Sequence, residues 1–156
     1  MSPRAACRLE ALSFAEVYDY VPGKADWLAH NLPVEGEAAD SATAGRVARD
    51  DVVTCAPQDG LASVRERVAR SPYRFALVTT PGGVVLGRLR ASALESAGDQ
   101  PAERLMEPGP STVRPDVPGH TLAQRLAERG LQTAIVTTPE GRLIGIARRE
   151  DLERAR

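Results

Sequence analysis

The sequence contains one segment twice, and this repeat limits the possible folds more than any other feature. Residues 78–87 read VTTPGGVVLG and residues 136–145 read VTTPEGRLIG, so matching positions lie 58 residues apart (136 − 78 = 58). The same offset relates further pairs on both sides: Thr54 and Thr112, Pro57 and Pro115, Arg67 and Arg125, Ala76 and Ala134, Arg90 and Arg148, and Leu94 and Leu152. A unit of this length cannot readily enclose its own core. We therefore expect the two copies to bury their apolar faces against each other, with any ligand cleft between them.

Each copy has the hydrophobic pattern of a β-α-β-β unit that is closed by a short helix. In the first copy Leu61, Val64 and Val68 share one helix face, and the helix ends at Ser71-Pro72 because proline disfavours helical backbone in the residue before it. The other elements expected there are an extended piece at 52–55, strands at 75–78 and 84–89, and a closing helix at 92–96. The second copy predicts a helix face with Leu122 and Leu126, a cap at Gly130, strands at 134–136 and 143–146, and a closing helix at 150–154.

The loop between the two predicted strands has proline at its second position in both copies. Residues 80–83 (TPGG) carry glycine at the third position, which a type II turn requires because that residue has a positive φ. In residues 138–141 (TPEG) Glu140 takes that position. The sequence therefore predicts a type II turn in the first copy, and a type I turn followed by a left-handed Gly141 in the second.

The residues before the repeat are expected to form a separate small unit. Leu9, Leu12, Phe14 and Val17 predict a helix that runs into a short strand at 17–20. A turn at Pro22-Gly23 and one more helical turn around Trp27 follow, ended by residues 31–33. Residues 36–45 are rich in Gly, Glu, Ala, Ser and Thr, which bury little apolar area, so a linker is predicted here, at residues 37–43.

The composition disfavours several classes of protein. With 20 basic and 21 acidic residues, the chain has no overall field that would attract nucleic acid or an anionic membrane. No apolar run approaches the roughly 20 residues that cross a bilayer, and no signal peptide is visible, so we expect a cytoplasmic protein. Cys7 and Cys55 are too few and too far apart for a disulfide framework, and His30 and His120 lack partners at metal-ligand spacing, so no metal site is expected.

The second copy carries the motifs that are most typical of a known family. They are Met106, residues 111–116 (STVRPD), residues 135–146 and residues 149–152 (REDL). Together with the duplication they resemble a tandem pair of cystathionine β-synthase (CBS) domains, an arrangement called a Bateman module. The resemblance implies an α/β (α+β) fold in which two β-α-β-β-α motifs pack as a pseudo-twofold pair behind an N-terminal helix-strand appendage. The expected units are residues 1–36, a linker at 37–43, the first CBS motif at 44–99 and the second at 100–156.

Residues 1–36 resemble a different family. Residues 5–9 (AACRL), Phe14, residues 17–18, Gly23, Trp27 and residues 32–34 are similar to the helix, strand and tail that follow the sulfur-transfer loop of a rhodanese domain. The nucleophile of that loop would precede Arg4, whereas Cys7 lies inside the predicted helix, without the cradle of N–H groups that activates a sulfur-transfer thiol. We therefore interpret this stretch as a rhodanese-like remnant, and sulfur transfer through Cys7 is the least favoured function.

The CBS resemblance implies a binding protein and no enzyme. It predicts that an adenine nucleotide or S-adenosylmethionine binds between the copies as an effector, without an obligatory cofactor, and that the protein forms a homodimer. Adenine needs a flat apolar slot with a few backbone groups. The residues that we expect to line it are Thr54, Cys55, Ala56, Phe75, Ala76, Thr112, Val113, Arg114, Thr133 and Ala134.

The ribose and phosphate groups would be bound by a family motif that runs Gly, two apolar residues, Ser or Thr, two variable residues, and Asp. Residues 145–151 keep Asp151 and have Arg148 in place of the hydroxyl residue, whereas residues 87–93 have Arg90 and Ala93 in the two places. Both arginines either bind phosphate, pair with carboxylates of the following helix or lie in solvent. Asp151 either binds ribose or favours the N–H groups at a helix start.

Two functions remain open on the sequence alone. The first is a regulatory module that senses an adenosine-containing nucleotide such as AMP, ATP or S-adenosylmethionine. The alternative is a dimerisation or scaffold module that binds no ligand, in which Arg90 and Arg148 have closed degenerate clefts.

Overall fold

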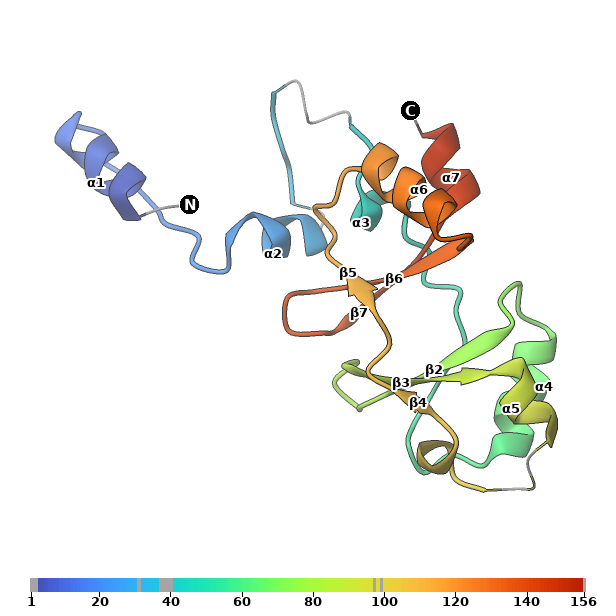
Figure 1. Ribbon diagram of the computed structural model, residues 1–156. Coiled ribbons are helices and arrows are strands. Elements are labelled where there is room, and N and C mark those ends of the chain that lie inside the picture. Colours follow the sequence, from blue (N-terminus) through green and yellow to red (C-terminus); the bar gives the residue numbers. More distant parts are fainter. Residues whose placement is uncertain (1–2, 31, 37–40, 97, 99, 156) are drawn as a thin grey trace.

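The structure, a computed structural model, describes residues 3–30, 32–36, 41–96, 98 and 100–155. Figure 1 shows two similar α/β halves, one below the other, with the N-terminal segment beside the upper half. Each half is built on its own sheet, one with four strands and one with three in the described residues. The expected mixed α/β fold with a duplicated unit is confirmed.

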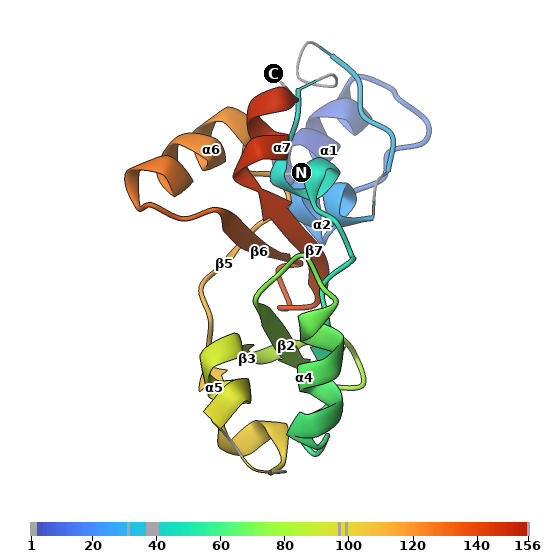
Figure 2. The ribbon, with the colours of Figure 1, turned by 90° about the vertical axis from the view of Figure 1, so that its right-hand side faces the viewer.

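The first half is a sheet with strand order β1-β2-β3-β4 and helices beside it. Its elements are β1 (Thr54–Cys55), α4 (Leu61–Ala69), β2 (Phe75–Thr79), β3 (Val85–Arg90), α5 (Ala91–Ser96) and β4 (Glu107–Pro108). β1 runs parallel to β2, whereas the pairs β2·β3 and β3·β4 are antiparallel. Helices α4 and α5 lie beside this sheet in Figure 2. The predicted β-α-β-β-α order is confirmed here.

The second half repeats this plan with strand order β5-β6-β7. Its elements are β5 (Thr112–Val113), α6 (Gly119–Glu128), β6 (Thr133–Thr137), β7 (Leu143–Arg148) and α7 (Arg149–Arg154). After α6, Gly130 has a positive φ of 64°, and the N–H of Leu131 donates to the carbonyl of Leu126 at 2.8 Å. The predicted glycine cap is therefore present.

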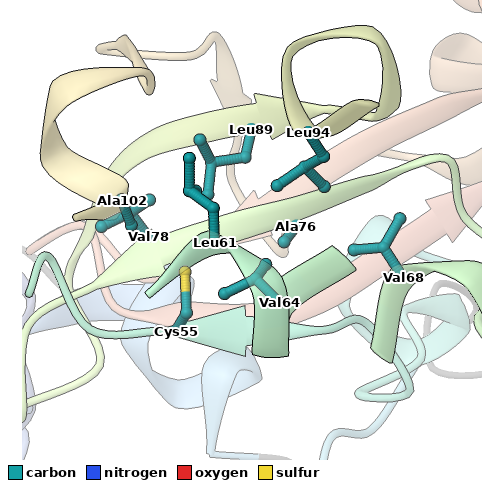
Figure 3. Packing of buried hydrophobic residues seen from close by; sticks show 9 residues of the cluster. All are labelled: Cys55, Leu61, Val64, Val68, Ala76, Val78, Leu89, Leu94 and Ala102. Carbon is teal, nitrogen blue, oxygen red and sulfur yellow. The ribbon is translucent and has the colours of Figure 1, made fainter. Parts of the chain in front are cut away.

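Each half encloses an apolar core of its own. Figure 3 shows the core of the first half, where Leu61, Val64 and Val68 of α4 lie with residues of the sheet, as their helical spacing predicts. In the second half the buried face of α6 carries Leu122, Ala123 and Leu126. Burying one large aliphatic side chain contributes about 1.5–3 kcal/mol, so these small cores are the main source of stability within each half.

Each core is completed by the segment that begins the other copy. Helix α3 (Ala44–Val47) belongs in sequence to the first copy, yet Ala44, Val47 and Ala48 pack into the core of the second half. The 3-10 helix η1 (Ala102–Arg104) begins the second copy and places Ala102, with Leu105 and Met106, in the core of the first half. The two copies therefore exchange their N-terminal segments, and neither has a complete core without the other.

The exchange extends to the backbone. Arg88 of β3 pairs with Glu107 of β4, and Ile146 of β7 pairs in the same way with Arg49, which is 58 residues before Glu107 (107 − 49 = 58). Arg49 and Ile146 exchange two backbone hydrogen bonds of 3.0 and 2.8 Å. The repeat in sequence thus becomes an approximate twofold symmetry in space.

A third apolar cluster lies along the seam where the two sheets meet. It contains Val52, Tyr73, Leu77, Ile135 and Ile146 from both halves. The tips of the two hairpins also pair, since the N–H of Val85 donates to the Gly141 carbonyl at 3.0 Å and that of Leu143 donates to the Gly83 carbonyl at 2.9 Å. The expectation that the copies bury apolar faces against each other is confirmed.

The hairpin turns are alike in both copies, which corrects one prediction. Gly83 has a φ of 79° and Gly141 a φ of 83°, whereas Gly82 is not among the glycines with positive φ. The type II turn predicted at residues 80–83 is therefore wrong, and the left-handed residue comes one position later. The threonine at the start of each loop explains the shared form, because the hydroxyl of Thr80 accepts from the N–H of Val84 and that of Thr138 from the N–H of Arg142.

The N-terminal segment differs most from its prediction. Helix α1 (Pro3–Ala11) ends before Leu12, and residues 17–20 form no strand, because no neighbouring strand in the described chain pairs with them. The predicted helical turn is present as α2 (Gly23–Ala29), which is stabilised by a hydrogen bond from Trp27 Nε1 to the Pro33 carbonyl at 2.8 Å. Residues 37–40 of the predicted linker lie outside the described residues. In the described part of the chain, no helix is long and apolar enough to span a membrane.

Candidate functional site

Two surface hollows lie at matching ends of the seam. The first hollow, of about 310 Å³, is lined by Arg74, Phe75, Arg88, Arg90, Ala91, Ser92 and Glu95. The second hollow, of about 230 Å³, is lined by Pro72, Tyr73, Gln132, Thr133, Arg148 and Glu150. Four lining positions correspond through the 58-residue offset: Arg74 and Gln132, Phe75 and Thr133, Arg90 and Arg148, and Ser92 and Glu150. The repeat therefore produces two equivalent sites, and each contains an arginine at the end of a strand.

In the second hollow Arg148 already has protein partners. Its Nη2 donates to Asp51 Oδ2 at 3.0 Å, and its Nε donates to the Tyr73 hydroxyl at 3.1 Å. The guanidinium carbon lies 4.8 Å from the centre of the Tyr73 ring, a cation–π distance. Tyr73 in turn donates from its hydroxyl to Asp51 Oδ1 at 2.6 Å. We call Asp51, Tyr73 and Arg148 the aspartate–tyrosine–arginine cluster.

The charges of this cluster support one another. Burial raises the pKa of the Tyr73 phenol, and the hydrogen bond to Asp51 raises it further, so the phenol stays protonated and donates. The hydrogen bond with Tyr73 is the main reason why the pKa of Arg148 is also raised. Asp51 lies between α3 and β1, so the cluster links the segment that follows α3 to the end of β7 in the second half.

Asp151 lies at the start of α7, and only 9% of its surface is exposed. Its Oδ1 accepts from Arg49 Nη2 at 2.8 Å, and Arg154 approaches the same oxygen at 3.5 Å. Its Oδ2 is buried and has no hydrogen-bond partner among the described residues. A buried acceptor without a partner is unfavourable, and a donor from outside the chain reaches this oxygen only if the surrounding side chains move.

In the first hollow a single glutamate binds two arginines. Glu107 Oε1 accepts from Arg90 Nε at 2.6 Å, and Oε2 accepts from Arg88 Nη2 at 2.9 Å. These hydrogen bonds, of which the one with Arg88 has the larger effect, lower the pKa of Glu107, so its carboxylate stays ionised. Ala93 stands where the second half has Asp151, so no carboxylate occupies that place in the first half.

The structure places only four of the thirteen candidate ligand-binding residues against a hollow. Phe75 and Arg90 pair across β2 and β3 and line the first hollow, and Thr133 and Arg148 pair across β6 and β7 and line the second. Asp151 adjoins Arg148. The remaining candidates lie elsewhere, in β1 and its loop, in β5 and its loop, or one residue further along the strands: Thr54, Cys55, Ala56, Ala76, Thr112, Val113, Arg114 and Ala134.

Two of these residues have a clear packing role. Cys55 and Ala76 are buried in the core of the first half. Burial raises the pKa of the Cys55 thiol to about 11, so it is unreactive near neutral pH. Cys7, in contrast, is exposed on α1. Among the described residues, no group of three or more His, Cys, Asp or Glu side chains is arranged to hold a metal ion.

Sequence patterns did not predict the partners of the arginines. Asp51 and Tyr73 bind Arg148, and Arg49 binds Asp151, from positions 75 to 102 residues away in the chain. The sequence did contain a signal for Arg49 and Glu107, because the 58-residue offset relates them. Each pairs with a residue near the end of a strand. Only the exchange of segments shows that Arg49 and Glu107 each bind a residue of the other copy.

Comparison with known proteins agrees with the fold described above. The family model of the CBS domain matches residues 102–156. The cytosolic domain of the Mg2+ channel MgtE in complex with ATP is similar in fold, with a TM-score of 0.65 and 21% identity over 74% of this chain, which spans 49% of that chain. CBSX2 in complex with AMP has a TM-score of 0.63 and 20% identity over 72% of this chain and 94% of that one.

A third structure is matched over almost its whole length. The CBS domains of a transcriptional regulator from Streptococcus pneumoniae have a TM-score of 0.63 and 15% identity, over 72% of this chain and 97% of that one. The fold is that of a CBS domain pair. Comparison by sequence with curated proteins gives no match. The family match lies within the second copy, and the rhodanese-like interpretation of residues 1–36 stays a prediction.

Proposed function

We propose that this CBS domain pair is a regulatory module that binds an adenosine-containing nucleotide in the hollows at its seam. The observation that carries the proposal is the presence of an arginine at the same position of both hollows, Arg90 and Arg148, each paired with a carboxylate. Two CBS proteins of similar fold are described in complex with ATP and with AMP. Similarity of fold motivates the ligand class, and the residues of this chain must supply the contacts.

The chemistry of the hollows suits such a ligand. A guanidinium binds phosphate through two parallel hydrogen bonds, and a charged hydrogen bond of this kind contributes about 1.5–3 kcal/mol. Asp151 lies close enough to Arg148 of the second hollow to influence its charge, and it supplies a carboxylate of the type that a ribose hydroxyl requires. The ring of Tyr73 and the edge of Thr133 lie in the same hollow and offer apolar surface to a base.

The proposed action is regulatory and involves no bond making. The second hollow is lined by residues of both halves, and the arginines of both hollows bind carboxylates on exchanged segments or on the loop beside them. A ligand that binds one arrangement of the halves more tightly shifts the population toward it. The energy available for that shift equals the difference in affinity between the two arrangements.

One observation favours a second function, a scaffold without ligand. The aspartate–tyrosine–arginine cluster already gives Arg148 an anionic partner and a ring to stack on. If Glu107 occupies Arg90 in the same way, both arginines have only a structural role. The module would then act through its surface, as a homodimer, and light scattering would show a dimer whose melting temperature does not respond to nucleotides.

A thermal-melt screen separates the two functions. The full chain is melted with AMP, ADP, ATP, S-adenosylmethionine and NAD, each far above the expected dissociation constant. Binding to the folded state alone adds about 2.7 kcal/mol of stability at a hundredfold excess of ligand, so the melting temperature rises. The double variant Arg90→Ala/Arg148→Ala should lose this rise, whereas Arg70→Ala, which removes an exposed arginine paired with Glu66, should keep it. No shift with any ligand would reject nucleotide sensing.

A further inference from the structure

The two hollows have the same backbone and opposite electrostatic character. Arg74, Arg88 and Arg90 face two carboxylates, Glu95 and Glu107, in or beside the first hollow, which leaves it with an excess of positive charge. In the second hollow, Arg148 is the lining cation, and Asp51 and Glu150 lie 3.0 and 3.9 Å from its guanidinium nitrogens. The neighbouring Arg49–Asp151 pair adds no net charge.

Asp51 makes the largest difference between the hollows. Its two carboxylate oxygens bind Arg148 and Tyr73, so they hold the position on the guanidinium that a phosphate oxygen would take. The corresponding residue in the first half is Gly109 (51 + 58 = 109), which has no side chain. A methyl group added at Gly109 would meet no atom within 4 Å, so the space equivalent to that of Asp51 is open there.

A phosphate that approaches Arg148 meets the negative charge of Asp51, and Asp51 could leave Arg148 only by breaking its bond to the Tyr73 hydroxyl as well. The side chain of Arg90 is 56% exposed, whereas that of Arg148 is only 19% exposed, so a phosphate from solvent reaches Arg90 more easily than Arg148. A phosphate can therefore replace Glu107 on Arg90 at smaller cost than it can replace Asp51 on Arg148.

We propose that the two hollows select ligands by charge: the first hollow binds the phosphate groups of a multiply phosphorylated ligand, and Asp51 reserves the second hollow for ligands without phosphate, such as a nucleoside. This inference rests on the proposed function for the identity of the base. Its charge rule also applies to inorganic polyphosphate, which needs no adenosine site.

The test is isothermal titration calorimetry of the full chain with ATP, with sodium tripolyphosphate and with adenosine. ATP should bind with a stoichiometry of one, and Arg90→Ala should weaken it by roughly 10- to 100-fold, the loss of one charged hydrogen bond. Arg148→Ala should weaken ATP binding less than Arg90→Ala does, and the control Arg70→Ala should leave ATP affinity within about twofold. Asp51→Asn keeps the shape of the side chain, removes the charge and should raise the ATP stoichiometry to two.

A reciprocal pair of variants guards against unfolding as an explanation. Gly109 has a φ of 58°, a conformation that Asp and Asn tolerate better than other side chains, so Gly109→Asp and Gly109→Asn should fold alike. Gly109→Asp should weaken ATP binding by about tenfold relative to Gly109→Asn, because only the aspartate adds a negative charge two residues from Glu107, the partner of Arg90. Circular dichroism melts of the two variants should coincide.

The outcomes separate this inference from the proposed function. If Arg148→Ala weakens ATP binding and Arg90→Ala does not, the charge rule is wrong, but nucleotide sensing is still supported. Tripolyphosphate binding that depends on Arg90, with ATP no tighter and adenosine silent, supports the charge rule and rejects adenosine sensing. If neither ATP nor tripolyphosphate binds the wild-type protein, or if Gly109→Asp and Gly109→Asn bind ATP equally, the inference is wrong.

Discussion

Gly87 of the first half and Gly145 of the second occupy the same place in β3 and β7, yet different parts of the chain require them to be small. A Cβ atom at Gly87 would lie 2.6 Å from the sulfur of Met106, whereas one at Gly145 would lie 2.3 Å from the carbonyl oxygen of Arg49. In both cases the neighbour belongs to the exchanged segment of the other copy. The first contact is with a flexible side chain, and the second is with backbone.

The same contrast holds for the polar groups. Glu107 and Arg49 lie at equivalent places, but one is an acid that binds two arginines and the other is a base that binds Asp151. The backbone pairing between exchanged segment and strand needs only close approach, so any residue type with a free N–H and carbonyl can supply it. Side chains at the hollows lie near the surface, and their charges differ between halves without disturbing that pairing.

The largest effect should come from the seam. Leu77→Ala removes a fully buried side chain where the halves meet and should lower the free energy of unfolding by about 2–5 kcal/mol, as in a domain core. Urea unfolding measures this change. Leu131→Ala, which truncates an exposed leucine, should stay within about 0.5 kcal/mol. A loss below about 1 kcal/mol for Leu77→Ala would show that the halves fold as independent units.

The two glycines provide the next comparison. Gly145→Ala should cost about 3 kcal/mol because the Arg49 backbone must move, and Gly87→Ala about 2 kcal/mol because the Met106 sulfur and Cγ can move with the rotamer while its Cβ, 2.9 Å away, must also shift slightly. Urea unfolding of both variants checks the difference. Equal costs would mean that the exchanged segment of the second half is as easily displaced as a side chain.

The buried carboxylate of the second half should show coupling that the first half lacks. Arg49→Met leaves Asp151 without its closest cation and should cost about 1–2 kcal/mol. In an Asp151→Asn background the same change should cost much less, because no buried charge remains to be compensated. A double-mutant cycle by urea unfolding measures the coupling, and an additive result would contradict the assigned role of the pair.

The smallest effect concerns acid stability in the first half. The pKa of Glu107 is lowered in the folded state, so its stabilising contribution is complete above its ordinary value near 4.5 and is lost as the pH falls below that value. Glu107→Gln should therefore lose stability less steeply than the wild type between about pH 5 and 3. Glu140→Gln, in an exposed turn, serves as the control and should parallel the wild type. Parallel curves for all three proteins would rule out a stabilising role for Glu107.

Prediction from the sequence succeeded where interactions are local. The helix faces of Leu61, Val64 and Val68 and of Leu122 and Leu126 are buried as their spacing predicts.

It failed where the outcome depends on a neighbour. Residues 17–20 have an extended pattern but no neighbouring strand in the described chain. In the first hairpin the hydrogen bond from the Val84 N–H to the Thr80 hydroxyl accompanies a turn in which Gly83, and not Gly82, has the positive φ. Candidates for the adenine slot lie away from the hollows for a similar reason, because Cys55 of β1 and Val113 of β5 pack with the cores of their halves.

The sequence by itself determined the duplication, the order of helices and strands in each copy and the positions of Arg90 and Arg148, because repeats and periodicity are visible along the chain. Tertiary structure alone decided that α3 and η1 change halves, and that Asp51 and Arg49 reach across to Arg148 and Asp151. Those two contacts join residues 97 and 102 positions apart and depend on the direction in which two finished units pack. No local pattern carries that direction, since the apolar faces would be equally hydrophobic in any other pairing.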